Sequence, residues 1–270
     1  MTHRIPEVLL LAVLLQACAT PIERLHATAR SLGFVQQTLA GEGFLLTAYY
    51  KHSDGPDRTL HVYLEGDGTP WLTPERVAPD PTPRNPLMLR LMGMDRSAAL
   101  YLGRPCYNGH ATDAGCSALL WTQRRYASEV VSAMSVALRN FLNVHPYADL
   151  VFAGHSGGGV LAMLMARHFP QTRLVTTLAA PLDIDAWTDH HGYSRLDGSL
   201  NPIDSAPAEF QEIHYFGAMD ERTPPILFAH ALARRPHARV IVMDRFDHAC
   251  CWEQIWPEIL RQLPPRLAGL

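Results

Sequence analysis

Ala153-Gly154-His155-Ser156-Gly157-Gly158-Gly159 follows directly on the apolar run Asp149-Leu150-Val151-Phe152 and leads into a stretch rich in Ala, Leu and Met. An apolar strand that runs into Gly-x-Ser-x-Gly and then into a helix is typical of a tight turn that exposes its serine. The pentapeptide alone is weak evidence, because chance supplies it in roughly one chain in twenty of this length. The flanking strand and helix make Ser156 a candidate nucleophile, with an ordinary glycine-rich turn as the alternative.

Segments with strand and helix character alternate on both sides of this turn. Apolar runs predict strands at 43–50, 60–65, 98–102, 149–152, 172–178, 212–216 and 239–243. Helical patterns cover 86–94, 128–143, the stretch from the turn to about 168, a segment after Pro225, and 252–262. The alternation predicts an α/β fold, with a mostly parallel, doubly wound sheet and helices on both faces.

Several residues suited to chemistry follow the ends of expected strands. They are Gly66-Asp67-Gly68, Ser156, Asp220 and His248. Binding sites of open α/β sheets form at the carboxyl ends of the strands, so we expect these residues to meet at one edge. Two connecting segments are expected to be irregular: residues 69–86, which contain six prolines, and a polar insertion at about 182–207.

The composition fits one domain with a sizeable core. Of the 270 residues, 47% are hydrophobic and 18% are charged. The formal net charge is −3 and no basic stripe is visible, which argues against a nucleic-acid partner. No His-x-Glu-x-x-His or Cys-x-x-Cys spacing occurs, so neither a metal site nor a cofactor is expected. We expect a single domain over 43–270, preceded by a tether and lead-in over 18–42.

The first residues resemble a bacterial lipoprotein signal peptide. Arg4 supplies a positive charge, and residues 8–15 form an apolar segment too short to span a bilayer. Leu15-Gln16-Ala17-Cys18 resembles a lipobox, whose Cys is acylated and becomes the new N-terminus. We expect a signal peptide over 1–17, lipidation at Cys18, and a membrane-anchored protein of the cell envelope, on the outer membrane and facing the periplasm. The alternative is a plain secretory signal and a secreted or periplasmic protein.

Four further cysteines follow. In an oxidising compartment disulfides are the default state of cysteines. Cys106 and Cys116 flank a loop that contains Asn108-Gly109, and we expect them to pair. Cys250 and Cys251 are adjacent, and the sequence leaves three states open for them: a vicinal bridge, free thiols, or exchange of partners with the other two.

The motifs and their order resemble the α/β-hydrolase superfamily over roughly residues 43–262. Narrower stretches are similar to a group of uncharacterised proteobacterial α/β hydrolases. These stretches are Tyr63-Leu64-Glu65-Gly66-Asp67-Gly68, Arg104-Pro105-Cys106, Trp121-Thr122 and His248-Ala249-Cys250-Cys251-Trp252. The resemblance implies a catalytic triad in the chain order serine, acid, histidine.

The resemblance assigns a role to each member of that triad. Ser156 would attack an acyl carbon, and His248, which follows the last expected strand, would take the serine proton. Asp220 lies in Gly217-Ala218-Met219-Asp220, which matches the Gly-x-x-Asp acid loop of the superfamily and would orient His248. Asp183, after the preceding strand, is the second candidate for the acid.

An oxyanion hole needs two backbone N–H groups directed at the developing negative oxygen. Gly157, immediately after the serine, would supply one. The resemblance places the other in the loop after the 60–65 strand, at Asp67 or Gly66.

The resemblance implies an esterase- or lipase-like serine hydrolase that cleaves small carboxylic esters through an acyl-Ser156 intermediate. A peptidase or acyltransferase with the same triad is an alternative. A catalytically inactive envelope lipoprotein that uses the scaffold as a binding module is another. Trp71, Trp121 and Trp187 are candidates for pocket lining or for packing, and Arg104 for anion binding or for bracing a loop.

Overall fold

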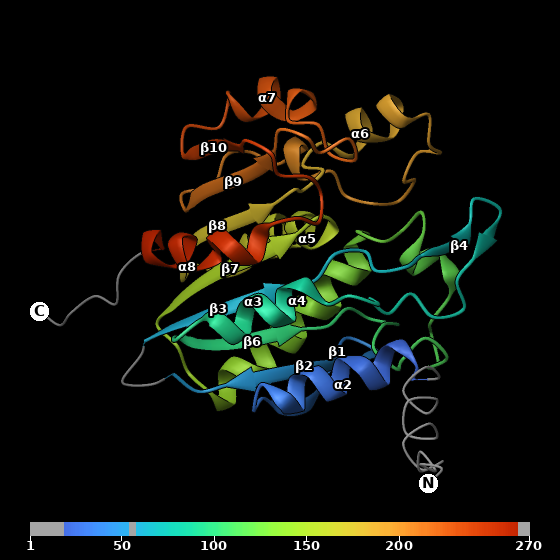
Figure 1. The fold of residues 1–270 in the computed structure, drawn as a ribbon. Coiled ribbons are helices and arrows are strands. Elements are labelled where there is room, and N and C mark those ends of the chain that lie inside the picture. Colours follow the sequence, from blue (N-terminus) through green and yellow to red (C-terminus); the bar gives the residue numbers. More distant parts are fainter. Residues whose placement is uncertain (1–18, 54–57, 264–270) are drawn as a thin grey trace, which may run out of the picture.

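An eight-stranded sheet forms the centre of the molecule (Figure 1). The computed structural model describes residues 19–53 and 58–263, so the expected signal peptide and Cys18 lie outside the described residues. The strands are β1 Val35–Gly41, β2 Phe44–Lys51, β3 Thr59–Leu64, β6 Ala98–Leu102, β7 Asp149–His155, β8 Thr172–Leu178, β9 Gln211–Gly217 and β10 Ala238–Met243.

The strands follow the order β1-β2-β6-β3-β7-β8-β9-β10 across the sheet. β2 pairs antiparallel with β1 and β6, and the other neighbours are parallel. The carboxyl ends of β3 and of β6 to β10 therefore lie at one edge, which we call the site edge. Parallel strands covered on both faces are apolar throughout, and β6 is buried at every residue. The predicted fold class is confirmed.

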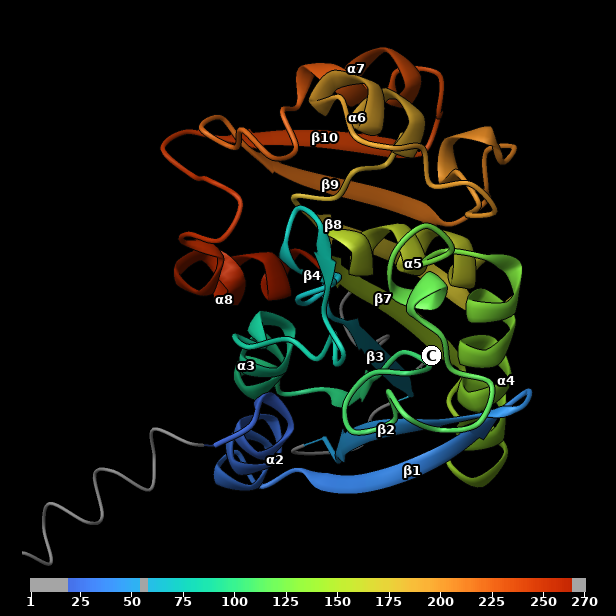
Figure 2. The same ribbon diagram turned by 90° about the vertical axis from the view of Figure 1, so that its right-hand side faces the viewer.

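Helices cover both faces of the sheet. They are α2 Pro21–Ser31, α3 Leu87–Met94, α4 Ser128–Val144, α5 Gly157–Ala166, α6 Ile184–His191, α7 Ile226–Leu232 and α8 Trp252–Gln262. Figure 2 shows α2, α3 and α8 on one side of the sheet and α4 and α5 on the other. Each side encloses its own hydrophobic core, around Met88 and Trp252 on the first and around Phe141 and Val160 on the second. Within residues 19–53 and 58–263, no helix combines the length and hydropathy that crossing a membrane requires.

The segment 18–42, expected to be a tether and lead-in, contains α2 and β1. α2 begins with a capping box, in which the Thr20 hydroxyl accepts the Glu23 N–H and the Glu23 carboxylate accepts the Thr20 N–H. Its buried Leu25 and Ala29 join the core beside α3. β1 then pairs with the whole length of β2. The helix was missed because only two of its eleven residues are fully buried, too few to give a clear periodic pattern.

The proline-rich segment 69–86 also contains regular structure, contrary to expectation. β4 Trp71–Thr73 and β5 Arg76–Val77 form a short hairpin that projects from the site edge (Figure 1). The prolines are compatible with this hairpin although proline has no backbone N–H. Pro74 lies in the turn, and Pro70 takes part in the pairing through its carbonyl oxygen, which accepts the Ala78 N–H.

The expected irregular insertion at 182–207 contains α6 and a short 3-10 turn, Pro202–Asp204. The Asp183 side chain accepts the Ala186 N–H and caps the start of α6. Gly192, with φ of +64°, ends it in the left-handed conformation. These end signals fix the helix although Ile184 and Thr188 are its only buried residues.

Candidate active site

Ser156 occupies a sharp turn between β7 and α5. Its φ of 51° and ψ of −127° are strained for a residue with a side chain, and its N–H donates to the Leu178 carbonyl at 2.8 Å. The turn requires glycine on both sides, because a Cβ on Gly154 would overlap the Gly158 backbone and one on Gly158 would overlap the Leu64 carbonyl. The serine side chain is only half-buried. The turn thus holds a reachable hydroxyl at the site edge.

His248 and Asp220 complete a hydrogen-bonded chain that starts at this hydroxyl. His248 Nε2 lies 3.1 Å from Ser156 Oγ, and His248 Nδ1 lies 3.0 Å from Asp220 Oδ2. Asp220 follows β9 and is fully buried, whereas the His248 side chain, in the loop after β10, keeps 16% of its surface exposed. The structure therefore brings together three predicted residues that lie far apart in the sequence.

The Asp220 carboxylate is held in its ionised form. Its Oδ1 accepts the N–H groups of Arg222 and Thr223, and its Oδ2 accepts the Thr223 hydroxyl. Burial alone would raise the pKa of Asp220, but the hydrogen bond and charge of His248 and the bonds from Thr223 outweigh it and lower the pKa. Thr223 was not predicted, and only its position three residues after the acid could have indicated it.

The backbone of His248 is also held by hydrogen bonds. Its carbonyl oxygen accepts two hydrogen bonds, from His155 Nε2 at 2.8 Å and from Trp252 Nε1 at 3.2 Å. A carbonyl can only accept, so His155 carries its proton on Nε2. Burial lowers the pKa of His155 to about 4, aided by the neighbouring His248, so this imidazole is neutral near pH 7. His155 is therefore a positioning residue that sequence analysis had not identified.

The loop after β3 lies against the serine turn. A Cβ on Gly66 would be 3.4 Å from the Cβ of Ser156. Gly66 itself is a poor oxyanion donor, because its N–H donates to the Glu65 carboxylate at 3.2 Å. The N–H groups of Asp67 and Gly157 make no hydrogen bond among the described residues. The structure thus favours the N–H of Asp67 over that of Gly66 as the second oxyanion donor, beside the N–H of Gly157.

The Asp67 side chain is anchored at three points. Its carboxylate accepts from Arg104 Nη1 at 2.8 Å, Arg125 Nη1 at 2.9 Å and the Tyr126 hydroxyl at 2.7 Å. The Tyr107 hydroxyl donates to the Asp67 carbonyl at 3.2 Å. Burial acts to raise the pKa of Asp67, but the two guanidinium groups prevail and lower it to about 2. We call these five residues the Asp67 clamp.

Two residues of the Asp67 clamp are positively charged and buried. Arg104 and Arg125 are 4% and 8% exposed, so Arg104 braces the loop, one of the two roles considered for it. Arg104 also donates to the Glu65 carbonyl at 3.2 Å. The Glu65 carboxylate accepts the N–H groups of Gly66 and Met88, yet burial raises its pKa to about 7.

Comparisons with known proteins bear on the fold that carries this site. The profile of the class 3 lipase family matches residues 105–185, which include the serine turn but less than half of the chain. An esterase from Pyrococcus furiosus is similar in structure, with a TM-score of 0.61 and 13% identity over 86% of this chain and 90% of that one. A membrane phospholipase A described as a bacterial virulence factor gives a TM-score of 0.55 and 15% identity over 94% of this chain and 97% of that one.

The chain has the α/β-hydrolase fold. An α/β serine hydrolase without a lid from Xanthomonas campestris gives a TM-score of 0.56 and 12% identity over 86% of this chain and 95% of that one. No curated protein matches the sequence. The strand order and the serine turn of the α/β-hydrolase fold are therefore present, and the superfamily expected from the residues is confirmed at the level of the fold.

Other predicted residues take structural places in this hydrolase fold. Asp183 caps α6 and accepts a hydrogen bond from the Asn201 side chain, so its carboxylate serves the helix start. Trp121 is buried in the core and donates to the Ala78 carbonyl, Trp187 donates to the Arg222 carbonyl, and Trp71 is 42% exposed.

The cysteines form two bridges. Cys106 joins Cys116, as predicted, and Cys250 joins Cys251, which was one of three states left open. Within the part of the chain that the structure describes, no group of three or more His, Cys, Asp or Glu side chains is placed to hold a metal ion.

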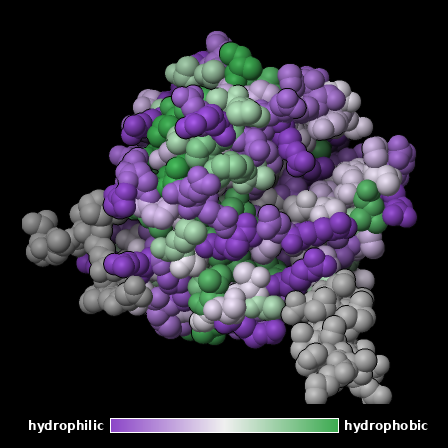
Figure 3. Space-filling view, in the orientation of Figure 1, coloured by the Kyte–Doolittle hydropathy of each residue, from purple (hydrophilic) through white to green (hydrophobic). Residues whose placement is uncertain are grey.

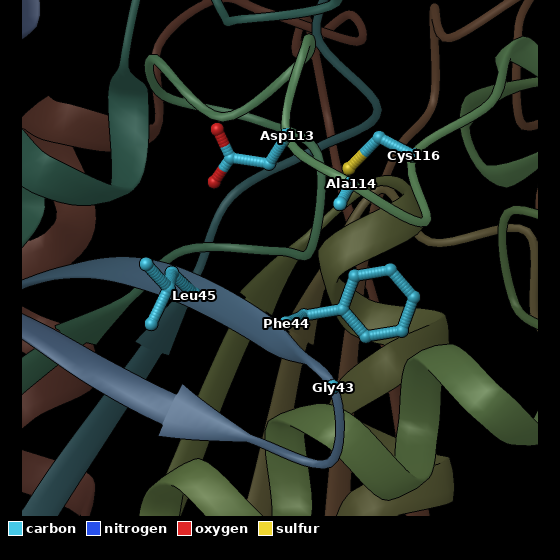
Figure 4. Close-up of a pocket in the computed structure, with 6 residues that line it drawn as sticks. All are labelled: Gly43, Phe44, Leu45, Asp113, Ala114 and Cys116. Atoms are coloured by element: carbon cyan, nitrogen blue, oxygen red, sulfur yellow. The ribbon is translucent and has the colours of Figure 1, made fainter.

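A hollow of about 330 Å³ lies away from Ser156, between the turn that joins β1 to β2 and the loop that carries the Cys106–Cys116 bridge (Figure 4). It is lined by Gly43, Phe44, Leu45, Asp113, Ala114 and Cys116. Figure 4 shows the Phe44 ring beneath the Cys116 loop and the Asp113 carboxylate turned away from it. None of the three residues of the hydrogen-bonded chain lines this hollow.

Proposed function

We propose that this protein is a serine hydrolase that cleaves carboxylic esters, with Ser156 as nucleophile, His248 as base and Asp220 as the acid that orients the base. The observation that carries the proposal is the continuous chain Ser156 Oγ, His248 Nε2, His248 Nδ1, Asp220 Oδ2, with separations of 3.1 and 3.0 Å. The first separation lies within the range over which a base can take a hydroxyl proton, and the second is that of a hydrogen bond between the base and the acid. The class 3 lipase match and the esterase-like structures support the reaction class.

In the first half of the reaction, Ser156 Oγ attacks the acyl carbon while its proton moves to His248 Nε2. The imidazolium that forms is stabilised by the ionised Asp220. The carbonyl oxygen becomes negative and accepts hydrogen bonds from the N–H groups of Gly157 and Asp67. Collapse of this intermediate breaks the ester C–O bond, and the leaving alkoxide takes the proton from His248, which leaves an acyl-Ser156.

In the second half, water attacks the acyl-Ser156 and gives its proton to His248. The intermediate collapses again, releases the carboxylic acid and returns the proton to Ser156 Oγ. Every proton transfer uses Nε2, because Nδ1 is bonded to Asp220 throughout. The carbonyl of His248, held by His155 and Trp252, keeps the ring in place during both halves.

The test is labelling by a fluorophosphonate probe together with hydrolysis of p-nitrophenyl butyrate. Wild type should react with both, and Ser156→Ala should lose both while its circular dichroism spectrum and thermal unfolding stay unchanged. A wild-type protein that takes no label would refute the proposal and favour the binding-module alternative. A protein that labels but cleaves only amide or thioester substrates would retain the triad and change the substrate class.

A further inference from the structure

Exposed apolar side chains gather at the site edge. Among the described residues, fourteen large hydrophobic side chains are exposed. Eight of them belong to this edge: Leu45, Trp71, Leu72, Leu119, Tyr193, Leu200, Met219 and Ile226. Four lie at the opposite ends of strands and helices, and two on the edge strand β10. We call the eight residues the apolar rim.

The rim consists of separate segments that lie at the same edge of the sheet as Ser156. Trp71 and Leu72 come from the β4–β5 hairpin after β3, and Met219 and Ile226 from the segment after β9. Figure 2 looks onto this edge and shows the hairpin near the centre, with α6 and α7 beyond it. In Figure 3 hydrophobic residues interrupt the mostly hydrophilic surface where the hairpin projects. Exposed apolar side chains that gather on one face of a molecule mark a protein or membrane contact.

The start of the described chain lies at the same edge. Ile22, in the first turn of α2, lies beside Gly109 in the loop after β6, because a Cβ on Gly109 would be 3.6 Å from Ile22 Cγ1. Leu32, at the other end of the helix, packs on Gly93, just before the start of β6. α2 therefore runs antiparallel to β6, and Figure 1 shows its first residues on the side of the β4 hairpin.

The tether between Cys18 and the fold would be very short. An extended chain covers at most about 3.6 Å per residue, so two residues place Thr20 within roughly 7 Å of a lipidated Cys18. α2 begins at Pro21, directly after its cap at Thr20. Acyl chains on Cys18 would therefore hold the site edge, and not the opposite edge, against the bilayer.

We propose that the apolar rim rests on a phospholipid bilayer and that the substrates of Ser156 are acyl esters carried in that bilayer. This inference rests on the proposed hydrolase function and on lipidation of Cys18. A lipid surface fits the rim better than a protein partner because the rim consists of separate tips at the edge where the reachable Ser156 lies, and a protein bound across this edge would cover Ser156. The aromatic rings of Trp71 and Tyr193, which are 42% and 56% exposed, are of the kind that occupies the level of lipid headgroups.

The experiment compares two doubly substituted full-length chains with wild type. Leu72→Glu/Ile226→Glu places charges on two separate parts of the rim. Leu32→Glu/Val144→Glu places the same charges on exposed side chains at the opposite edge. Each protein is incorporated into vesicles of phosphatidylethanolamine and phosphatidylglycerol. Phospholipid hydrolysis is measured beside hydrolysis of p-nitrophenyl butyrate, and the ratio of the two rates is the readout.

The rim variant should lower the ratio of phospholipid to soluble-ester hydrolysis by about ten-fold or more, because charges at lipid depth oppose contact with the bilayer. The opposite-edge variant should keep the wild-type ratio. Equal ratios in all three proteins would overturn the proposal. If the rim variant fails to fold, as judged by thermal unfolding, Met219→Glu supplies the same comparison from one exposed residue.

A second readout does not depend on catalysis. Full-length Cys18→Ser, which cannot be acylated there, should still sediment with the vesicles, and adding Leu72→Glu/Ile226→Glu should abolish sedimentation. If sedimentation depends on the rim but wild type hydrolyses no ester, the hydrolase function fails while the lipid contact stands. If Cys18→Ser ignores vesicles and forms dimers that the rim substitutions dissociate, the rim joins two copies and the lipid proposal is wrong.

Discussion

The carboxylate of Asp67 occupies the space that a side chain on Gly157 would need. A Cβ built on Gly157 overlaps Asp67 Oδ1 and comes close to the Tyr126 hydroxyl. The first residue of α5 and the loop after β3 are thus in direct contact, so a side chain added at Gly157 would displace the Asp67 carboxylate. The proposed oxyanion hole therefore depends on the absence of a side chain at Gly157 and on the presence of the Asp67 carboxylate.

Gly157→Ala should remove most of the activity. The new methyl group must displace the Asp67 carboxylate, which moves one proposed oxyanion donor away from the other. Loss of one such donor costs about 10²–10³ in kcat. Steady-state hydrolysis of p-nitrophenyl butyrate measures the loss, and Gly93→Ala, in α3, where the new methyl group would meet only the flexible Leu32 side chain, is the comparison for a glycine outside the site. Activity within two-fold of wild type would contradict the arrangement.

Removing the charge of Asp67 should destabilise the protein. Asp67→Asn leaves the buried Arg104 without its charged partner, and breaking a buried pair in this way typically costs about 3–5 kcal/mol of unfolding free energy. Urea unfolding measures the change. Asp189→Asn breaks the exposed pair with Arg195 and should cost less than about 1 kcal/mol. Equal losses in the two variants would show that the clamp does not contribute through its buried charges.

Asp220→Asn should lower kcat strongly without unfolding the protein. An amide can offer a donor to His248 Nδ1, which would favour the wrong tautomer, and the corresponding change in a Ser-His-Asp enzyme lowers kcat by about 10⁴. The matched control is Glu221→Gln, because Glu221 is the exposed neighbour in the sequence. A fall in KM alone, or an equal loss in both variants, would point to another residue as the acid.

Glu65 should make stability depend on pH between about 4.5 and 7. Burial raises its pKa to about 7 from an ordinary value of 4.5, so in this interval the folded protein binds the proton that the unfolded chain has released. Its contribution to stability is therefore greatest at low pH and declines as the pH rises through 7, by about 3 kcal/mol in all.

Glu65→Gln cannot titrate, so the difference in unfolding free energy between wild type and variant should change over that interval. Urea unfolding at pH 5, 6, 7 and 8 supplies the comparison. A difference that stays constant across the four pH values would contradict a raised pKa. The comparison with the variant cancels the contributions of other groups, among them His155, whose lowered pKa has the opposite effect on stability below pH 6.5.

Much of the fold could be predicted from the sequence where burial is complete. β6, β8 and α8 have the expected bounds, because β6 is buried throughout, β8 is buried at all but one residue, and α8 has a strong amphipathic pattern. α2 and the β4–β5 hairpin could not be predicted in this way. α2 has two buried residues, and the hairpin strands are only three and two residues long. Capping and local turn geometry determine these elements, and hydrophobic periodicity does not report either of them.

The same distinction holds for the site. Ser156, Asp220 and His248 each follow a strand, so topology alone indicated that they could meet. Arg125 and Tyr126 lie 58 and 59 residues from Asp67 in the sequence, and more than twenty residues after the end of β6, so they do not directly follow a strand. His155 directly precedes the nucleophile, and its role toward the His248 carbonyl appears only when the loop after β10 is placed beside β7.

The two donors to the His248 carbonyl have a consequence for how related sequences can diverge. His155 belongs to the strand that precedes the nucleophile, and Trp252 to the first turn of α8. The carbonyl oxygen of His248 therefore links the nucleophile strand to the last helix. A smaller residue at position 155 would leave Trp252 as the one donor of this pair to the His248 carbonyl. A smaller residue at position 252 would likewise leave His155. Positions 155 and 252 should therefore co-vary in an alignment of relatives, and a lineage that changes one should compensate at the other.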